Sequence, residues 1–341
     1  KIGSPLFFNK VNPDIKWGSP ACGTVKTIEY GSRRVIQKIE IQLSDSQESE
    51  KNKKYKNSEI IGLDREVAID TILGANIFPF FRQRPFNIIP DPKVIPRDIF
   101  VSAINTAPLA FDQEVVIKEN LDSFQAGVDA LNTLTSGKVY LTSKTGSVVS
   151  SIQNVEAYTI DGPHPAGNVG IQIHHISHLK PGENVWTINS QDVITIGKLF
   201  LRGIYDPTRV ITLAGPCIKE PGHFRVNAGA KISTITNGRM IDNEKRIISG
   251  DVLTGRGTSH EDFLSFYDYS ISVISDEVKR EFIGMLNPGS SSSRYSLTPV
   301  FLSLSKLLYR FNTSQNGSHR AVVPINAWER VLPMDILPNE L

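Results

Sequence analysis

The spacing of apolar and polar residues first separates a short N-terminal region from the rest of the chain. Residues 4–43 hold short apolar runs divided by Asn-Pro, Ser-Pro and Gly-Ser pairs, and residues 35–43 (VIQKIEIQL) alternate with the period of two that is typical of a half-buried strand. We predict a small β module over residues 1–45. Residues 46–60 are rich in Ser, Lys and Glu, which predicts an exposed linker or loop; a contact of its lysines with an anionic lipid surface is the alternative.

Predicted strands and helices then alternate over residues 61–205, which indicates a parallel α/β sheet. A helix is expected to begin at Asp64, which can cap it, and to end before Pro79. Residues 98–104 (DIFVSAI) indicate a buried strand, and residues 119–137 a helix that ends at Gly137. One face of this helix carries Leu121, Phe124, Val128 and Leu131. Further strands are predicted at 138–143 and 155–161, and a last helix at 191–203.

The pattern changes again after this unit. Short strands with Gly and Pro turns predict a second, β-rich domain over residues 206–275, and residues 276–341 look irregular, with a loop-like serine run at 289–294. The chain starts inside a predicted turn without an initiator Met and ends on an apolar stretch. We therefore expect it to be part of a longer protein.

Composition narrows the function classes. The 341 residues are 40% hydrophobic and 21% charged, as in ordinary globular domains. A formal net charge of +2 is too balanced for a nucleic-acid-binding protein. No window is apolar enough for a membrane span, and the first residues lack a basic region followed by an apolar core, so we expect neither a membrane span nor a secretion signal.

Metal ligation is not indicated by the cysteines or histidines. Cys22 and Cys217 stand alone without a CxxC pair, so we expect two reduced structural thiols. Residues 170–177 (GIQIHHIS) alternate Ile with polar residues, which predicts a strand. On a helix, His174 and His178 would share one face as possible metal ligands, because they are four positions apart. On the predicted strand they would lie about 13 Å apart, too far to hold one ion. No HExxH motif is present, and we predict no metal site.

Phosphate-binding and nucleophile motifs are also missing. The chain has no GxxxxGK(S/T) and no GxSxG, and the nearest approach to GxGxxG, at residues 255–260, lies in the β-rich part. The predicted strand 98–104 is followed by NTAPLAFD rather than by glycines. We predict no catalytic and no cofactor-binding residue in this chain.

The segment FPFFRQRPF (78–86) has two interpretations. Phe78, Phe80 and Phe81 could cap the preceding helix and fill the core, or they could form with Arg82 and Arg84 a stacking surface for a quinone or a docking patch.

Several long segments resemble, in order, the NqrA family, which belongs to the bacterial sodium-translocating NADH:quinone oxidoreductase. They are GSPLFFNKVNPDIKWGSPACGTV, RPFNIIPDP, RDIFVSAINTAPLA, GPHPAG, INSQDVITIGKLFLRG, RVITLAGPCIKEPGHFRVNAGA and AWERVLPMDILP. The resemblance covers nearly the whole chain. It implies further residues before position 1 and a helical part after position 341.

The resemblance also implies a fold of class α/β plus β. It consists of a biotinyl/lipoyl-like barrel-sandwich module, a Rossmann-like parallel α/β domain and a β-grasp (SLBB-like) domain. In carriers of this barrel type, a PxxG turn, here Pro20 to Gly23, follows the hairpin with the modified lysine. Asn12 stands near that position and Lys10 is two residues away, so we expect the module to be architectural.

Related proteins hold FMN on a glycine-rich loop before the first sheet strand. These relatives are RnfC of the Rnf complex and the flavin-binding subunit of respiratory complex I. The corresponding residues 73–86 of this chain contain Gly74 alone and several bulky aromatic residues. The resemblance therefore predicts no FMN, with the aromatic side chains filling the flavin space.

The function implied is that of a peripheral subunit on the cytoplasmic side of the bacterial inner membrane. The complex is a translocase that oxidises NADH, reduces ubiquinone and pumps Na⁺, and this chain itself is expected to be non-catalytic. Its partners would be the other subunits, especially the membrane-embedded covalent-flavin subunits. FMN, FAD, iron–sulfur clusters and NADH would belong to those other subunits, while ubiquinone is a candidate ligand of this one.

The loop GPHPAG (162–167) is expected to be a rigid corner at a domain junction or subunit interface, because prolines stiffen and glycines allow close approach. A polar contact from His164 to quinone is the alternative. The quinone or interface candidates are Phe80, Phe81, Arg82, Arg84, Gly162, Pro163, His164, Pro165 and Gly167.

Two other functions stay open. An FMN- and NADH-binding electron-input protein like RnfC would need cysteine motifs for iron–sulfur clusters, which two isolated cysteines do not supply. A biotin or lipoate carrier would show a mass increase on Lys10 or on another lysine of the module.

Overall fold

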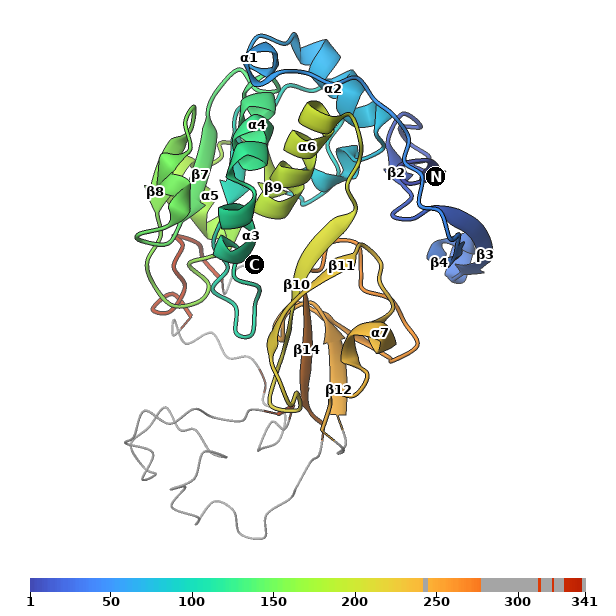
Figure 1. Ribbon diagram of the computed structural model, residues 1–341. Coiled ribbons are helices and arrows are strands. Elements are labelled where there is room, and N and C mark those ends of the chain that lie inside the picture. The colour runs from blue at the N-terminus through green and yellow to red at the C-terminus, as the bar shows by residue number, and fades with distance from the viewer. Residues whose placement is uncertain (242–244, 277–311, 314–320, 322–327, 339–341) are drawn as a thin grey trace.

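The computed structural model describes the chain except for residues 242–244, 277–311, 314–320, 322–327 and 339–341. Most of the irregular segment predicted over 276–341 therefore lies outside the described residues. Figure 1 shows an α/β domain above a smaller C-terminal β domain, with the N-terminal strands at one side of the α/β domain.

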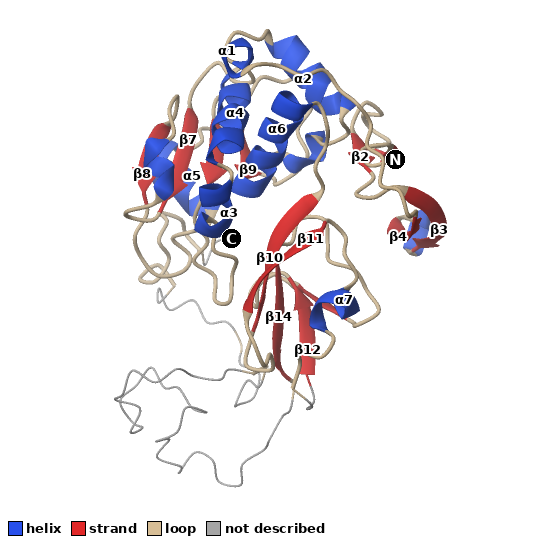
Figure 2. Cartoon of the chain, in the orientation of Figure 1, coloured by secondary structure: helices blue, strands red, loops and turns tan. Residues whose placement is uncertain are grey.

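The N-terminal region forms two separate hairpins. β1 (Pro5–Phe8) pairs antiparallel with β2 (Lys16–Gly18), and β3 (Gly23–Tyr30) pairs antiparallel with β4 (Ile36–Leu43). The strand predicted from the alternation over residues 35–43 is present as β4. The β3–β4 hairpin stands away from the body, and nearly all of β3 is exposed (Figure 2).

The segment predicted as an exposed linker is tied to the α/β domain by its main chain. The N–H of Asn52 donates to the Gly203 carbonyl at 2.7 Å, and the N–H of Tyr55 donates to the Phe200 carbonyl at 2.8 Å. The Tyr55 side chain is buried. A short helix, α1 (Asn57–Ile60), follows. Composition describes side chains, so it could not reveal this main-chain attachment.

The sheet of the α/β domain has the strand order β5-β9-β6-β7-β8. β6 (Ile99–Ser102), β7 (Val139–Ser143), β8 (Glu156–Thr159) and β9 (Val185–Asn189) are parallel, as predicted. β5 (Arg82–Arg84) adds an antiparallel edge strand to β9. The sequence analysis did not predict β5, because three residues give no periodic pattern.

Helices cover both faces of this sheet. α2 (Arg65–Gly74), α3 (Glu114–Glu119), α4 (Leu121–Asn132) and α6 (Ser190–Arg202) belong to the main core with Ile99 and Val101 of β6. The intervening Phe100 packs on the opposite face with Ile173 of α5 (Val169–Ser177). Successive strand residues point to opposite faces, so β6 contributes to both layers.

The helices predicted around residues 64–79, 119–137 and 191–203 are present, and Phe124, Val128 and Leu131 are fully buried. The predicted helix 119–137 ends earlier, at Asn132, and Gly137 lies in the turn before β7. The last of these helices ends at Gly203, whose φ of 69° is left-handed, a conformation that glycine adopts without strain.

The strand predicted at 170–177 is wrong, because these residues form the helix α5 (Val169–Ser177). An alternation of Ile with polar residues over eight positions also fits one partly buried helix face, and the contact with β6 decided the outcome. His174 and His175 of α5 bond to the main chain of Asp335 and Pro333 at 3.3 and 2.7 Å.

The C-terminal β domain, residues 208–275, is a mixed five-stranded sheet in the order β11-β10-β14-β12-β13. Its strands are β10 (Thr208–Ala214), β11 (Gly222–Asn227), β12 (Lys245–Ser249), β13 (Arg256–Thr258) and β14 (Ser270–Ser275). α7 (Ile232–Thr236) packs on one face of this sheet, with Ile211, Leu213 and Val273 in the shared core. The short strands predicted in this part of the chain are present.

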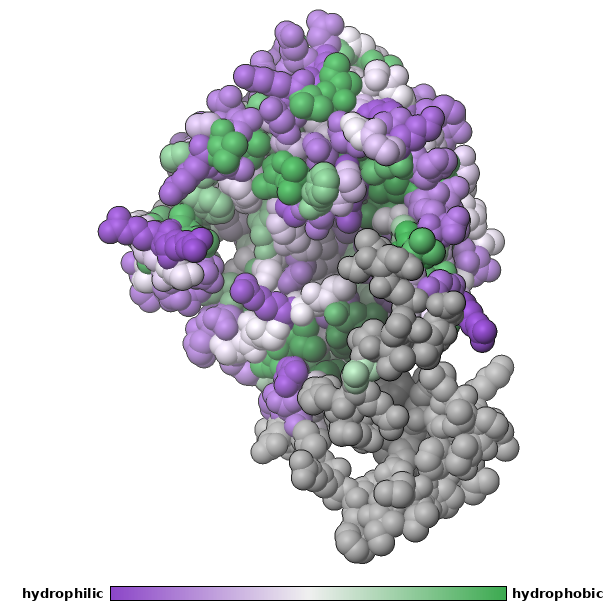
Figure 3. Space-filling model, turned by 180° about the vertical axis from the view of Figure 1, so that it is seen from behind, coloured by the Kyte–Doolittle hydropathy of each residue, from purple (hydrophilic) through white to green (hydrophobic). Residues whose placement is uncertain are grey.

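Among the described residues, every helix is too short or too polar to cross a bilayer. On the face seen in Figure 3, apolar side chains form separate patches between hydrophilic ones rather than one continuous band.

Candidate functional site

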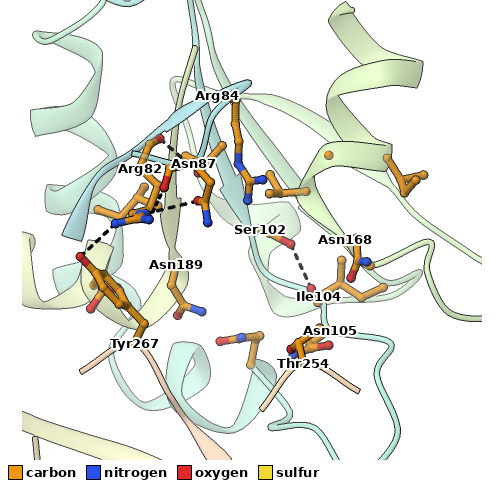
Figure 4. A pocket seen from close by; sticks show the side chains of 18 of the residues that line it. Arg82, Arg84, Asn87, Ser102, Ile104, Asn105, Asn168, Asn189, Thr254 and Tyr267 are labelled. Carbon is orange, nitrogen blue, oxygen red and sulfur yellow. Dashed lines mark hydrogen bonds between the residues drawn. The ribbon is translucent and has the colours of Figure 1, made fainter. Parts of the chain in front are cut away.

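A cavity of about 600 Å³ lies between the α/β domain and the C-terminal β domain. The chain runs from β6 to β7 and β8 on one side and returns to β9 on the other, so the direction of strand order changes between β6 and β9. Ligands of open α/β sheets bind outside the carboxyl ends of the strands at such a switch point. Ser102 at the end of β6 and Asn189 at the end of β9 line the cavity (Figure 4).

Arg82 and Arg84 form one wall of the cavity from β5. They are two positions apart on a strand and therefore lie on the same face of the sheet. The Arg82 guanidinium donates to the side-chain oxygen of Asn87 at 3.3 Å, to the Asn87 carbonyl, and to the Tyr267 hydroxyl at 3.3 Å. It also lies 5.0 Å from the Tyr267 ring. Arg82 is thus held in place by neutral groups.

Arg84 differs from Arg82 because it has no partner. Its Nε–H is shielded from solvent and lies near no acceptor, and no ion pair involves Arg84 within the described chain. Burial, and then the nearby charge of Arg82, lower the pKa of Arg84 below its usual value. Figure 4 shows the Arg84 guanidinium turned into the cavity.

The floor of the cavity contains a buried ionic cluster that joins the two domains. Asp192, in the first turn of α6, accepts a hydrogen bond from the Tyr269 hydroxyl at 2.6 Å and lies 3.8 Å from Nη2 of Arg209. Burial raises the pKa of Asp192 to about 6, although the charge of Arg209 and the hydrogen bond from Tyr269 oppose the shift. The Arg209 guanidinium also donates to the carbonyl of Phe266.

The GPHPAG loop packs against the loop that follows β6. Thr106 bonds through its hydroxyl to Nδ1 of His164 at 3.2 Å and accepts the N–H of Gly167 at 2.9 Å. A Cβ on Gly167 would come within 2.6 Å of the Thr106 nitrogen, so only glycine allows this approach. The pKa of Asp251 in the C-terminal β domain lies below its ordinary value. Burial opposes this shift, but hydrogen bonds from Thr254 and Leu253, with a smaller contribution from nearby His164, outweigh it.

The structure separates the predicted site residues into three groups. Four line the cavity: Phe80, Arg82, Arg84 and Gly167. Phe81 is fully buried, and its ring lies 5.3 Å from that of Trp186 in the core. Gly162, Pro163, His164 and Pro165 belong to the adjoining loop and do not line the cavity. The aromatic segment therefore contributes both to the core and to the cavity. The sequence analysis predicted that its side chains fill the space that FMN takes in related proteins, but a cavity lined by Phe80 is left open here.

Other cavity residues were not identified from the sequence. The start of α5, where Asn168 precedes the helix and Gly170 lies in its first turn, was missed because α5 was predicted as a strand. Asn105 comes shortly after β6, and Asn189 is the last residue of β9. The carboxyl ends of parallel strands meet at one edge of a sheet, so the sequence could have indicated that these two residues lie near each other. No local signal pointed to Tyr267, because it comes from the other domain.

No group of three His, Cys, Asp or Glu side chains suited to a metal ion occurs in the part of the chain that the structure describes. The polar groups that line the cavity are arginine, amide and hydroxyl groups and the carboxyl of Asp192.

Comparison with known proteins gives consistent results over the whole chain. Family models described as the NqrA N-terminal barrel-sandwich hybrid domain, the NqrA second alpha/beta domain and the NQRA C-terminal domain match residues 1–44, 63–205 and 210–260. The NqrA subunit of the Na(+)-translocating NADH-quinone reductase of Saccharophagus degradans is 39% identical over 348 residues, which cover 100% of this chain and 77% of that protein. The protein of the same name from Neisseria meningitidis is 39% identical over 346 residues, covering 100% and 77%.

A solved structure, the crystal structure of an NAD+-reducing NiFe hydrogenase in the H2-reduced state, overlaps with a TM-score of 0.43 at 10% identity, over 63% of this chain and 48% of that chain. The identity and coverage of the sequence relatives carry the assignment: this chain belongs to the NqrA family of the Na(+)-translocating NADH-quinone reductases.

Proposed function

We propose that this chain acts as a peripheral, redox-inactive subunit on the cytoplasmic side of a membrane-bound Na⁺-translocating NADH–quinone reductase. It would dock on the other subunits, chiefly the membrane-embedded covalent-flavin subunits, which would carry the FMN, FAD, iron–sulfur and NADH sites. The alternative of an RnfC-like protein is not supported, because the relatives bear the name of the Na(+)-translocating NADH-quinone reductase.

One observation carries this proposal. The switch point, where an α/β sheet would hold a nucleotide, is formed by loops without a glycine-rich turn. β6 is followed by residues 103–107 (AINTA) and β9 by Ser190 and Gln191. The residues there can bind and orient a molecule, but they include no nucleophile–base pair for acyl transfer.

Purification of the full-length protein from gently solubilised membranes of its own bacterium tests this role. Mass spectrometry should identify two kinds of partner, the membrane-embedded flavin subunits and the NADH-oxidising subunit. The separated chain should release neither flavin nor iron. Recovery of Rnf proteins, or of a yellow isolated chain with bound FMN, would refute the proposal.

Quinone association is a second candidate function of the cavity. Phe80, Arg82, Arg84 and Gly167, predicted as candidates from the sequence, line one space together with Tyr267. An aromatic ring beside amide and hydroxyl donors is a chemically suitable setting for a quinone head group. A short-chain quinone titration of the isolated chain and of the complex should saturate, and the absence of saturable binding in both would exclude this function.

We also propose the finer fold assignments and their boundaries: a biotinyl/lipoyl-like module over 1–45, a Rossmann-like domain over 61–205 and a β-grasp domain over 206–275. The parallel pairing of β10 with β14 and the helix α7 on one face support the last of these. GPHPAG would be the rigid corner where the second and third domains meet, which agrees with its contacts to Thr106 and its proximity to Asp251.

A further inference from the structure

The walls of the switch-point cavity carry positive charge that no carboxylate of the described chain neutralises. Arg82 bonds to an amide oxygen, a carbonyl and a hydroxyl, and Arg84 bonds to nothing within the described residues. Leaving a buried charged donor without an acceptor costs more than the ~1–3 kcal/mol of a neutral one. An acceptor supplied by a ligand would remove that cost.

The one acidic side chain that lines the cavity, among the described residues, does not balance these arginines. Asp192 is engaged by the hydroxyl of Tyr269 and by Arg209, which lies behind it in the junction. Asp192 and Arg209 offset each other, so Arg82 and Arg84 leave the cavity with excess positive charge.

The first turn of α5 supplies further donors to the cavity. Asn168 precedes this nine-residue helix without capping it through its side chain, and the N–H groups of Val169 and Gly170 have no acceptor within the described chain. All three residues line the cavity. Unpaired N–H groups and the helix dipole make such a terminus attractive to an anion.

We infer that this cavity binds a small molecule through a phosphate group, held by Arg82 and Arg84 and by the first turn of α5. A guanidinium fork and helix N–H groups match the geometry and charge of phosphate oxygens. The volume of about 600 Å³ leaves room for an organic part beside the phosphate. A neutral quinone, the second candidate ligand above, could accept hydrogen bonds from these arginines but would leave their charge unneutralised. The inference goes beyond the proposed role in the complex, which requires no phosphate ligand here.

The test uses calorimetric titration of the full-length protein with AMP and with inorganic phosphate. Arg84→Gln removes the unpaired guanidinium and should weaken binding by about ten- to a hundredfold, the loss expected for one charge-assisted hydrogen bond. Arg33→Gln, at an exposed position in the turn between β3 and β4, is the matched control and should leave the affinity unchanged.

Gly170 offers a second, independent pair of variants. An added Cβ there meets no atom within 4 Å, so substitution should leave the fold intact. Gly170→Asp places a negative charge in the cavity and should abolish phosphate binding, whereas the isosteric Gly170→Asn should retain most of it. Asp in a first helical turn also favours the helix, so loss of binding by this variant would not reflect unfolding.

A phospholipid headgroup presents the same phosphate chemistry, and vesicles separate the two sources. Binding of AMP or phosphate that depends on Arg84 and is blocked by Gly170→Asp supports a soluble ligand. Binding only to phosphatidylglycerol vesicles, and not to phosphatidylcholine vesicles, with the same dependence assigns the phosphate to a lipid. The inference is overturned if nothing binds, or if neither Arg84→Gln nor Gly170→Asp changes the binding. Because partner recovery is measured separately, failure here leaves the proposed role in the complex untouched.

Discussion

The junction between the α/β and C-terminal β domains and the β3–β4 hairpin differ in how their side chains are covered. At the junction, Arg209 is 5% exposed and its guanidinium lies 5.7, 5.2 and 4.9 Å from the rings of Phe80, Phe266 and Tyr269. On the hairpin, Tyr30 is 59% exposed. Both regions contain apolar residues in strands, but two domains cover the junction, whereas the hairpin reaches the C-terminal β domain through Lys38, 5.9 Å from the Phe263 ring, and leaves most of β3 exposed. Stability and ligand chemistry should therefore depend on the junction.

The largest effect is expected for Arg209→Leu. The change leaves Asp192 as a buried carboxylate without its cationic partner, which should lower the free energy of unfolding by about 3–5 kcal/mol in urea denaturation. The double variant Arg209→Leu with Asp192→Asn should recover part of this loss, because no uncompensated charge remains. Purely additive losses would show that the two charges do not interact.

The next effect is a pH dependence that originates from Asp192. Burial raises its pKa from 3.8 to about 6, so between these pH values the folded chain holds a proton that the unfolded chain has released. The contribution of Asp192 to the free energy of unfolding should rise as pH falls through this window, by up to about 1.4 kcal/mol per pH unit. Urea unfolding at about pH 6.5 and about pH 5 should show this slope. It should disappear in Asp192→Asn and persist in Asp45→Asn, which changes an exposed aspartate.

A smaller effect is expected for the second ion pair that crosses the junction. Arg225 of β11 donates to Glu119 of α3 at 2.9 Å, but the two side chains are 65% and 56% exposed. Solvent screens such a pair, so Arg225→Gln should change the free energy of unfolding by less than about 1 kcal/mol, and less at high salt. A loss as large as that of Arg209→Leu would mean that exposure does not distinguish the two pairs.

The smallest effect is expected on the hairpin. Ile28 of β3 is 40% exposed, and Thr keeps a β-branched side chain suited to a strand. Ile28→Thr should therefore alter the free energy of unfolding by no more than about 0.5 kcal/mol. A substantially larger loss in the full-length protein would indicate that another part of that protein covers this face.

The candidate site was only partly accessible from the sequence. Phe80, Arg82 and Arg84 stood out because aromatic and basic residues are dense in one segment, and Gly167 because glycine and proline cluster in GPHPAG. The sequence did not indicate that these two segments, about 80 residues apart in the chain, share a cavity with Tyr267. Their meeting depends on strand order and domain packing, which local patterns do not encode.

The sequence by itself determined that the elements with long patterns exist: β6, α4, α6, whose end Gly203 marks, and the strands of the C-terminal β domain. Their periodicity records one buried face and their caps are local, so neighbouring residues suffice to predict them. Only the tertiary structure decided that residues 170–177 are helical, that β5 closes the sheet edge, and that Arg84 faces the cavity without a partner. These outcomes depend on contacts between segments distant in the chain, where packing energy outweighs weak local preference.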